Sequence, residues 1–145
     1  MGFMILIAMA LTGCTGQRNV IVKNAKLSEV YKKVVNAVIL NNNQVTYQDE
    51  NYQVMQVYFG SVHVEGSTNT NGSVDSDGNF HASTYKSNDI DIIHKASLEF
   101  IPEGNDVRIA IVYSGNLRTG EYATAILDRL KKSYKIIDAD SGSEL

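Results

Sequence analysis

The spacing of apolar residues along the chain predicts two amphipathic helices, over residues 27–41 and 120–137. Each has one apolar stripe at i, i+3, i+4 spacing, which is the pattern of a helix that covers a core. Thr119 is the residue expected to cap the second helix. The stripes consist of Leu27, Val30, Tyr31, Val34, Val35, Val38 and Ile39 in the first helix, and of Tyr122, Ala123, Ile126, Leu127, Leu130, Tyr134 and Ile137 in the second.

Alternating apolar and polar residues predict four strands between these helices, at about 44–48, 52–59, 90–101 and 107–113, and a short strand at 20–22 precedes the first helix. The breakers between the last two strands predict that they form an antiparallel hairpin. This order predicts an α+β, two-layer sandwich: an antiparallel sheet of four to five strands with two helices on one face and a polar, open opposite face. The residues expected to face the core in the third strand are Ile90, Ile92, His94, Ala96, Leu98 and Phe100.

Residues 60–88 are a polar insert, rich in Ser, Thr, Asn and Gly, that a minimal sandwich does not need. Two interpretations are open: a β-hairpin that turns near Gly72 or at Asp77-Gly78, where Asp-Gly suits a type I′ turn, or a mobile loop. Inserts on rigid scaffolds often carry binding, although an exposed spacer without a partner would have the same composition. The residues predicted to contact a partner are Asn69, Asn71, Asp75, Asp77, Phe80 and Tyr85.

Charge and motifs argue against several classes of function. The formal net charge is −3 and no basic patch is present, so nucleic-acid binding is not expected. No nucleophile elbow, phosphate-binding loop or acid/base pair occurs, which indicates a protein that is not an enzyme and has no catalytic residues.

Metal binding is also not expected. His63 and His81 could face each other across the insert, but no third ligand is indicated, and His94 fits a core or edge position. The acidic stretch 75–79 fails as an EF-hand loop, because Ser73 and Thr84 stand where Asp and Glu are needed.

The N-terminus has the features of an export signal. Phe3 to Leu11 is an uncharged apolar run, too short to span a bilayer and of the length of a signal-peptide h-region. The sequence Leu11-Thr12-Gly13-Cys14 that follows resembles the lipobox of bacterial lipoproteins. Met1-Gly2 lacks the Lys or Arg of such signals; an upstream start and a reading frame that begins late are the two explanations left open.

The resemblance implies a fate for the only cysteine. Residues 1–13 would be removed as a signal peptide, and Cys14 would carry a diacylglycerol and an N-acyl chain, so no other cofactor is expected. Residues 14–19 would be a short tether, 20–138 a single domain and 139–145 a flexible tail. Because Thr15, not Asp, follows the cysteine, the resemblance implies an outer-membrane anchor with the domain facing the periplasm.

Together these features predict a membrane-anchored envelope lipoprotein that acts as a non-enzymatic binding or scaffolding module, with an envelope protein as its partner. The mature domain loosely resembles, in element order only, small accessory lipoproteins of envelope assembly or secretion machines. One alternative is a periplasmic carrier of a small apolar ligand or lipid held between helices and sheet, and a hydrolase is a more remote one.

Overall fold

The computed structural model describes residues 14–115 and 117–145. The expected signal peptide therefore lies outside the described residues, including Leu11, Thr12 and Gly13 of the lipobox. The chain divides into a larger compact unit, which includes residues 14–60 and 93–145, and a smaller one, Ser61–Ile92. Its elements are β1 (Cys14–Val22), α1 (Leu27–Leu40), β2 (Gln44–Gln48), β3 (Val54–Val64), β4 (Thr68–Val74), β5 (Phe80–Lys86), β6 (Ile90–Glu103), β7 (Asp106–Gly115), α2 (Leu117–Leu130) and β8 (Ile136–Asp138).

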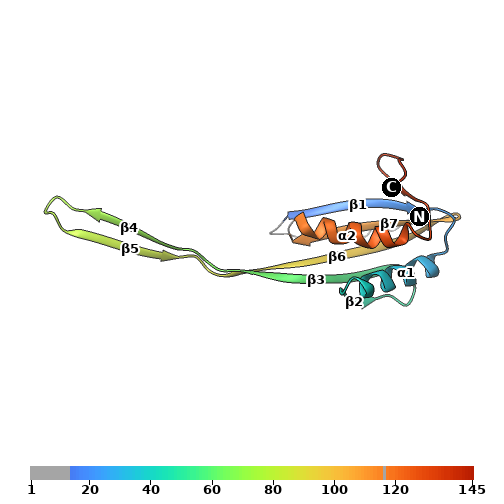
Figure 1. The fold of residues 1–145 in the computed structure, drawn as a ribbon, viewed down its shortest axis with the longest axis horizontal. Coiled ribbons are helices and arrows are strands. Elements are labelled where there is room, and N and C mark those ends of the chain that lie inside the picture. The colour runs from blue at the N-terminus through green and yellow to red at the C-terminus, as the bar shows by residue number, and fades with distance from the viewer. Residues whose placement is uncertain (1–13, 116) are drawn as a thin grey trace. The chain divides into compact units, whose positions relative to one another are not determined.

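The main sheet has the strand order β2-β3-β6-β7-β1-β8, and α1 and α2 pack against each other over it (Figure 1). The predicted β6–β7 hairpin is confirmed, with Glu103 paired to Asp106 next to its turn. The α+β class is also confirmed. The sheet has six strands among the described residues instead of four or five, because β8 pairs with β1 on the side away from β7.

The core lies between the helices and one face of the sheet, as the alternation predicts. His94, Ala96, Leu98 and Phe100 are all buried on β6, whereas Ile90 at the start of that strand is 61% exposed. Ile90 was expected to face the core, but it belongs to the smaller unit, which has no helix to cover it. The other buried core residues include Val20 and Val22 on β1, Val30, Tyr31, Val34, Ala37 and Val38 on α1, Met55 and Val57 on β3, Val107, Ile109 and Ile111 on β7, and Ala123, Ile126, Leu127 and Leu130 on α2.

Tyr31 joins α1 to the β2–β3 end of the sheet. Its hydroxyl donates to the Val54 carbonyl oxygen at 2.8 Å and accepts the Asp49 backbone N–H at 2.9 Å. The ring lies against Phe100, with centroids 4.9 Å apart, and meets Tyr52 edge-on at 5.5 Å. Burial, the largest influence, raises the pKa of Tyr31 above its ordinary value.

The expected tether is part of the sheet, which corrects the prediction for residues 14–19. β1 begins at Cys14, and its pairing with β7 runs without interruption from Cys14 opposite Gly115 to Val22 opposite Val107. The first five of these residues have almost no apolar content, so periodicity gave no strand signal. A neighbouring strand supplies the hydrogen-bond partners that make them extended.

The C-terminal segment also differs from the prediction. α2 ends at Leu130 instead of continuing to 137, and Ile136 enters the core as part of β8. Residues 139–145, expected to be a flexible tail, fold back: the Leu145 N–H donates to the Ile136 carbonyl at 3.0 Å. The Asp138 carboxylate accepts the N–H groups of Asp140 and Ser141, and these two hydrogen bonds are the main reason that its pKa is lowered.

Candidate functional site

The insert forms a regular two-stranded hairpin, the first of the two alternatives that its sequence allowed. β4 and β5 pair in register from Thr68 opposite Lys86 to Val74 opposite Phe80. Every residue of both strands is exposed. A hairpin of this kind offers its backbone edges and both of its faces for contact.

Asp75 organises the turn at the tip of the hairpin. Its backbone carbonyl accepts the Gly78 N–H at 3.1 Å, and its carboxylate accepts the N–H groups of Asp77 and Asn79 at 3.0 and 2.8 Å. The other carboxylate oxygen lies 2.8 Å from His81 Nε2. Hydrogen bonding to His81, followed by the Asn79 N–H, lowers the pKa of Asp75.

Of the two turn positions left open, the turn forms at Asp77-Gly78, and Gly72 lies within β4, but the predicted turn type is wrong. A type I′ turn needs a positive φ at both Asp77 and Gly78, and only Gly78 has one, at 82°. Instead, the hydrogen bond from the Gly78 N–H to the Asp75 carbonyl closes a turn over residues 75–78. Gly78, the last residue of this turn, has the left-handed conformation.

The six predicted contact residues fall into three groups. Asn69, Asn71 and Tyr85 lie on one face, because Asn69 is opposite Tyr85 and alternate residues of a strand share a face. Phe80 lies on the other face, where its ring covers Gly72; a Cβ at that glycine would come within 2.6 Å of it. Asp75 and Asp77 are in the turn.

Histidine–aspartate pairs lie at both ends of the smaller unit. His63 Nδ1 is 2.6 Å from Asp91, and its Nε2 is 3.5 Å from Asp89. The Asp89 carboxylate also accepts the Gly66 N–H at 2.7 Å. The arrangement in which His63 and His81 could face each other across the insert does not form: each has its own aspartate partner, and His81 is opposite Ser73. Among the described residues, no three His, Cys, Asp or Glu side chains are arranged to hold a metal ion.

The smaller unit is acidic. Residues 61–92 contain five carboxylates, which are Glu65, Asp75, Asp77, Asp89 and Asp91, and one lysine, Lys86, so their formal charge is −4 with neutral histidines. This exceeds the −3 of the whole chain. The sequence contains these residues, but their concentration in one structural unit becomes visible only once the bounds of that unit are known.

A second polar group, His94 with Thr119, is buried inside the larger unit. The Thr119 hydroxyl is hydrogen-bonded to His94 Nδ1 at 2.9 Å and lies 3.2 Å from the Ser114 carbonyl oxygen. Thr119 is thus inside the first turn of α2 and is not its cap as predicted. His94 Nε2 is buried and has no hydrogen-bond partner among residues 14–115 and 117–145. Of the core and edge positions that the sequence allowed for His94, it takes the core position.

Cys14 lies at the first position of β1, opposite Gly115. Its lipidation stays a prediction. No helix among the described residues is both long and apolar enough to cross a membrane.

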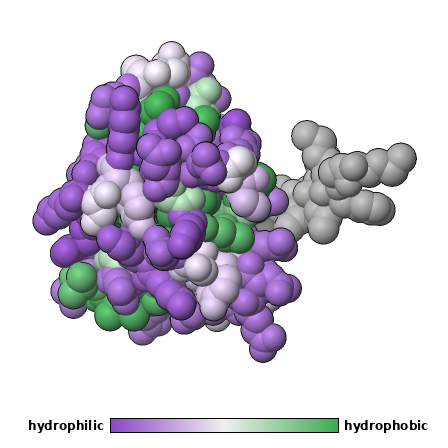
Figure 2. Space-filling model, turned by 90° about the vertical axis from the view of Figure 1, so that its right-hand side faces the viewer, coloured by the Kyte–Doolittle hydropathy of each residue, from purple (hydrophilic) through white to green (hydrophobic). Residues whose placement is uncertain are grey.

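The larger unit presents a mainly hydrophilic surface on the face drawn in Figure 2, where the apolar residues form small, separate groups. The hairpin also has exposed apolar side chains: Val74, Phe80 and Tyr85 are 66%, 69% and 67% exposed, similar to Leu40 of the larger unit at 64%.

Comparisons with known proteins do not identify the chain. No family model and no curated protein matches it. Two solved structures align with most of the chain at 10% sequence identity and a TM-score of 0.34 each. A protein from Thermus thermophilus, TTHA0849, aligns over 81% of this chain and 93% of its own, and Ms6760 from Mycobacterium smegmatis over 80% and 88%. Similarity at this level supports no conclusion about fold or function.

Proposed function

We propose that this protein is a membrane-anchored bacterial envelope lipoprotein that binds an envelope protein through the hairpin Ser61–Ile92, without catalysing a reaction. The observation that carries this proposal is the complete exposure of an ordered hairpin. All residues of β4 and β5 are exposed, and they include large apolar side chains. An isolated two-stranded hairpin is marginally stable in water, so burial against a partner would stabilise it.

The side chains of the hairpin suit a contact surface with a protein. Phe80 and Val74 are cross-strand neighbours on one face, and together they form a small apolar patch beside the turn. Tyr85 and the two asparagines on the other face supply an aromatic ring with polar groups. Aromatic anchors surrounded by adaptable polar residues are common at binding surfaces.

The charge of the unit indicates the chemistry of the partner. With five carboxylates and one lysine, the hairpin would attract a protein surface rich in lysine and arginine, which would speed association and fix its orientation. A second copy of the chain fits less well, because two acidic hairpins would repel each other. The partner we propose is therefore a different envelope protein with a basic surface.

The outer face of the main sheet is a weaker candidate for the contact. Its exposed apolar residues include Ile93 on β6 and Val112 on β7, and Val112 lies between Gln17 and Ser97 on the neighbouring strands. It therefore forms no continuous apolar patch with them.

The proposal is tested by placing a photo-crosslinking amino acid at Phe80 or Tyr85 in the full-length lipoprotein and irradiating intact cells. We expect both positions to give a crosslink to the same envelope protein. Tyr47, which is 51% exposed on β2 of the larger unit, is the matched control position and should give no such product. An equal yield of that product from Tyr47, or no product from either hairpin position, would overturn the proposal.

A second experiment addresses the charge. Glu65→Gln combined with Asp89→Asn and Asp91→Asn should reduce capture of the partner, and the wild-type interaction should weaken as salt is raised from about 50 to about 500 mM because exposed charges are screened. Capture that does not respond to either change would show that the partner is not recognised by its basic surface.

A further inference from the structure

A cleft beside α2 contains an arginine in an unusual position. The inward-facing residues of β1 are Gly16, Arg18, Val20 and Val22, since alternate residues share a face and the two valines are fully buried. Arg18 thus occupies a core-side position, beneath the N-terminal half of α2, and is itself partly buried. A guanidinium is seldom buried without a partner that satisfies its charge.

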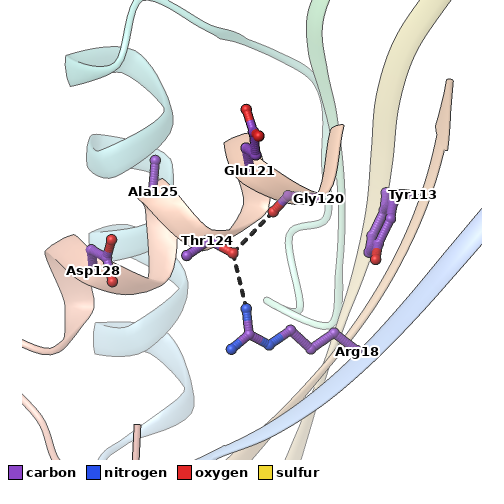
Figure 3. A pocket seen from close by; sticks show the side chains of 7 residues that line it. All are labelled: Arg18, Tyr113, Gly120, Glu121, Thr124, Ala125 and Asp128. Carbon is purple, nitrogen blue, oxygen red and sulfur yellow. Dashed lines mark hydrogen bonds between the residues drawn. The ribbon is translucent and has the colours of Figure 1, made fainter. Parts of the chain in front are cut away.

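Arg18 has few partners in the part of the chain that the structure describes. Its Nη1 donates to the Thr124 hydroxyl at 3.0 Å, and that hydroxyl donates to the Gly120 carbonyl at 3.0 Å (Figure 3). No carboxylate of the described chain lies within 4 Å of the guanidinium. The charge of Arg18 helps to lower the pKa of the Asp138 carboxyl, but it is the smallest of the causes of that shift. A guanidinium has five N–H donors in a planar fork, so most of them are available to a group that enters the cleft.

Small residues create the space around it. The cleft has a volume of about 440 Å³, within the range of small-molecule sites, and is lined by Arg18, Tyr113, Gly120, Glu121, Thr124, Ala125 and Asp128. The Tyr113 ring lies directly on Gly16, where a Cβ would come within 2.2 Å of it. The Tyr113 hydroxyl is 3.4 Å from the position that a Cβ of Gly120 would take. A side chain at Gly16 would therefore displace the ring and change the shape of the cleft, whereas a Cβ at Gly120 would only touch the Tyr113 hydroxyl.

The charges of the cleft have both signs. Arg18 and the Tyr113 hydroxyl lie on the sheet side, whereas Glu121 and Asp128 are exposed on α2 (Figure 3). A simple anion would meet the carboxylate of Glu121 and that of Asp128, which pairs with Lys131 Nζ at 3.0 Å, and a simple cation would meet the guanidinium. A ligand with a negative and a positive group avoids both repulsions.

We propose that this cleft binds a small zwitterion of the amino-acid class. Its carboxylate pairs with the guanidinium of Arg18 in a two-point hydrogen-bonded contact, and its ammonium group faces Glu121 or Asp128. The site is independent of the proposed contact through the hairpin, because all of its residues belong to the larger unit. Arg18 provides the affinity for the carboxylate, and the two acidic residues provide the preference for a ligand that also carries an amine.

The experiment uses the full chain and follows amide chemical shifts by NMR during titration with glycine and lysine as zwitterions, acetate as an anion and ethylamine as a cation. We expect a zwitterion to bind with shifts around residues 18, 113 and 120–128, and acetate and ethylamine to bind at least about tenfold more weakly. Arg18→Gln should weaken zwitterion binding by at least about tenfold, whereas Arg18→Lys, which keeps the charge and loses the planar fork, should weaken it less.

Two further variants test whether binding depends on Arg18 specifically and on the two acidic residues of the cleft. Arg108→Gln removes an arginine that pairs with Glu103 on the other face of the sheet, and it should leave binding unchanged. Glu121→Gln with Asp128→Asn involves exposed side chains only, so the fold should persist while the preference for zwitterions over acetate falls. Equal binding of glycine and acetate to the wild type, or no binding of any of the four probes up to about 10 mM, would overturn the proposal.

Discussion

The Tyr31 hydroxyl provides a sharp test of how α1 is attached to the sheet. Tyr31→Phe removes the hydrogen bonds to the Val54 carbonyl and from the Asp49 N–H but leaves the ring against Phe100. Two net hydrogen bonds would contribute about 1–3 kcal/mol. The Asp49 N–H also donates to the Val54 carbonyl directly, at 3.2 Å, so neither group loses its last partner. We therefore expect the free energy of unfolding to fall by about 1–2 kcal/mol, the lower part of that range.

Urea denaturation followed by circular dichroism measures this loss. With a slope of about 2 kcal/mol per molar urea, the midpoint of Tyr31→Phe should fall by about 0.5–1 M. Tyr52→Phe is the matched control, because the Tyr52 hydroxyl has no hydrogen bond within the described residues, and its effect should stay within about 0.5 kcal/mol. Equal midpoints for the two variants would refute the assignment of stability to the Tyr31 hydroxyl.

The same variant should change the response to alkaline pH. Because burial raises the pKa of Tyr31 above 10.0, the folded state favours the neutral phenol. The stability that this preference contributes is complete below pH 10 and is lost as the pH rises through the raised pKa. Tyr31→Phe should lose less stability than the wild type over this range, and an unchanged alkaline profile would contradict the cause assigned to the pKa.

Three further outcomes are expected. Cys14→Ser should release the protein from the membrane fraction or block its processing, and a variant that is still processed and attached would exclude lipidation at this residue. Hydrogen bonding to His81 and then to backbone N–H groups lowers the pKa of Asp75. The stabilisation of the turn by this carboxylate is therefore complete above pH 3.8 and is lost as the pH falls through the lowered pKa. Cross-strand NOEs between β4 and β5 should weaken over that range, and Asp75→Asn should weaken them already at pH 7. Gly16→Ala should destabilise the protein by about 1–3 kcal/mol, because the new Cβ would clash with the Tyr113 ring. Adding Tyr113→Ala should remove most of that loss of stability. If thermal unfolding shows that the losses of the two substitutions add up, this contact is not the cause.

By itself, the sequence determined the parts of the fold in which one face is buried. The stripe of α1 and the alternation of β6 and β7 identified most of the buried positions, because burying one face forces apolar residues to recur with the period of the backbone. Asp77-Gly78 was one of two turn positions that the sequence offered for the hairpin, and it forms the turn because glycine accepts the positive φ needed there.

Only the tertiary structure decided where strands form without an apolar pattern of their own. Residues 15–19 became part of β1 because β7 supplies their hydrogen-bond partners. Ile137, which was predicted in the stripe of the second helix, lies in β8 because β1 offers an edge for pairing. Arg18 is the clearest case. The residues next to Arg18 in the sequence do not indicate a binding site. Its inward position can be deduced only when β1 is known to start at Cys14, because Arg18 then shares a face with the buried Val20 and Val22. Backbone pairing between strands that are distant in the sequence determined these positions, and the local pattern of apolar and polar side chains does not predict such pairing.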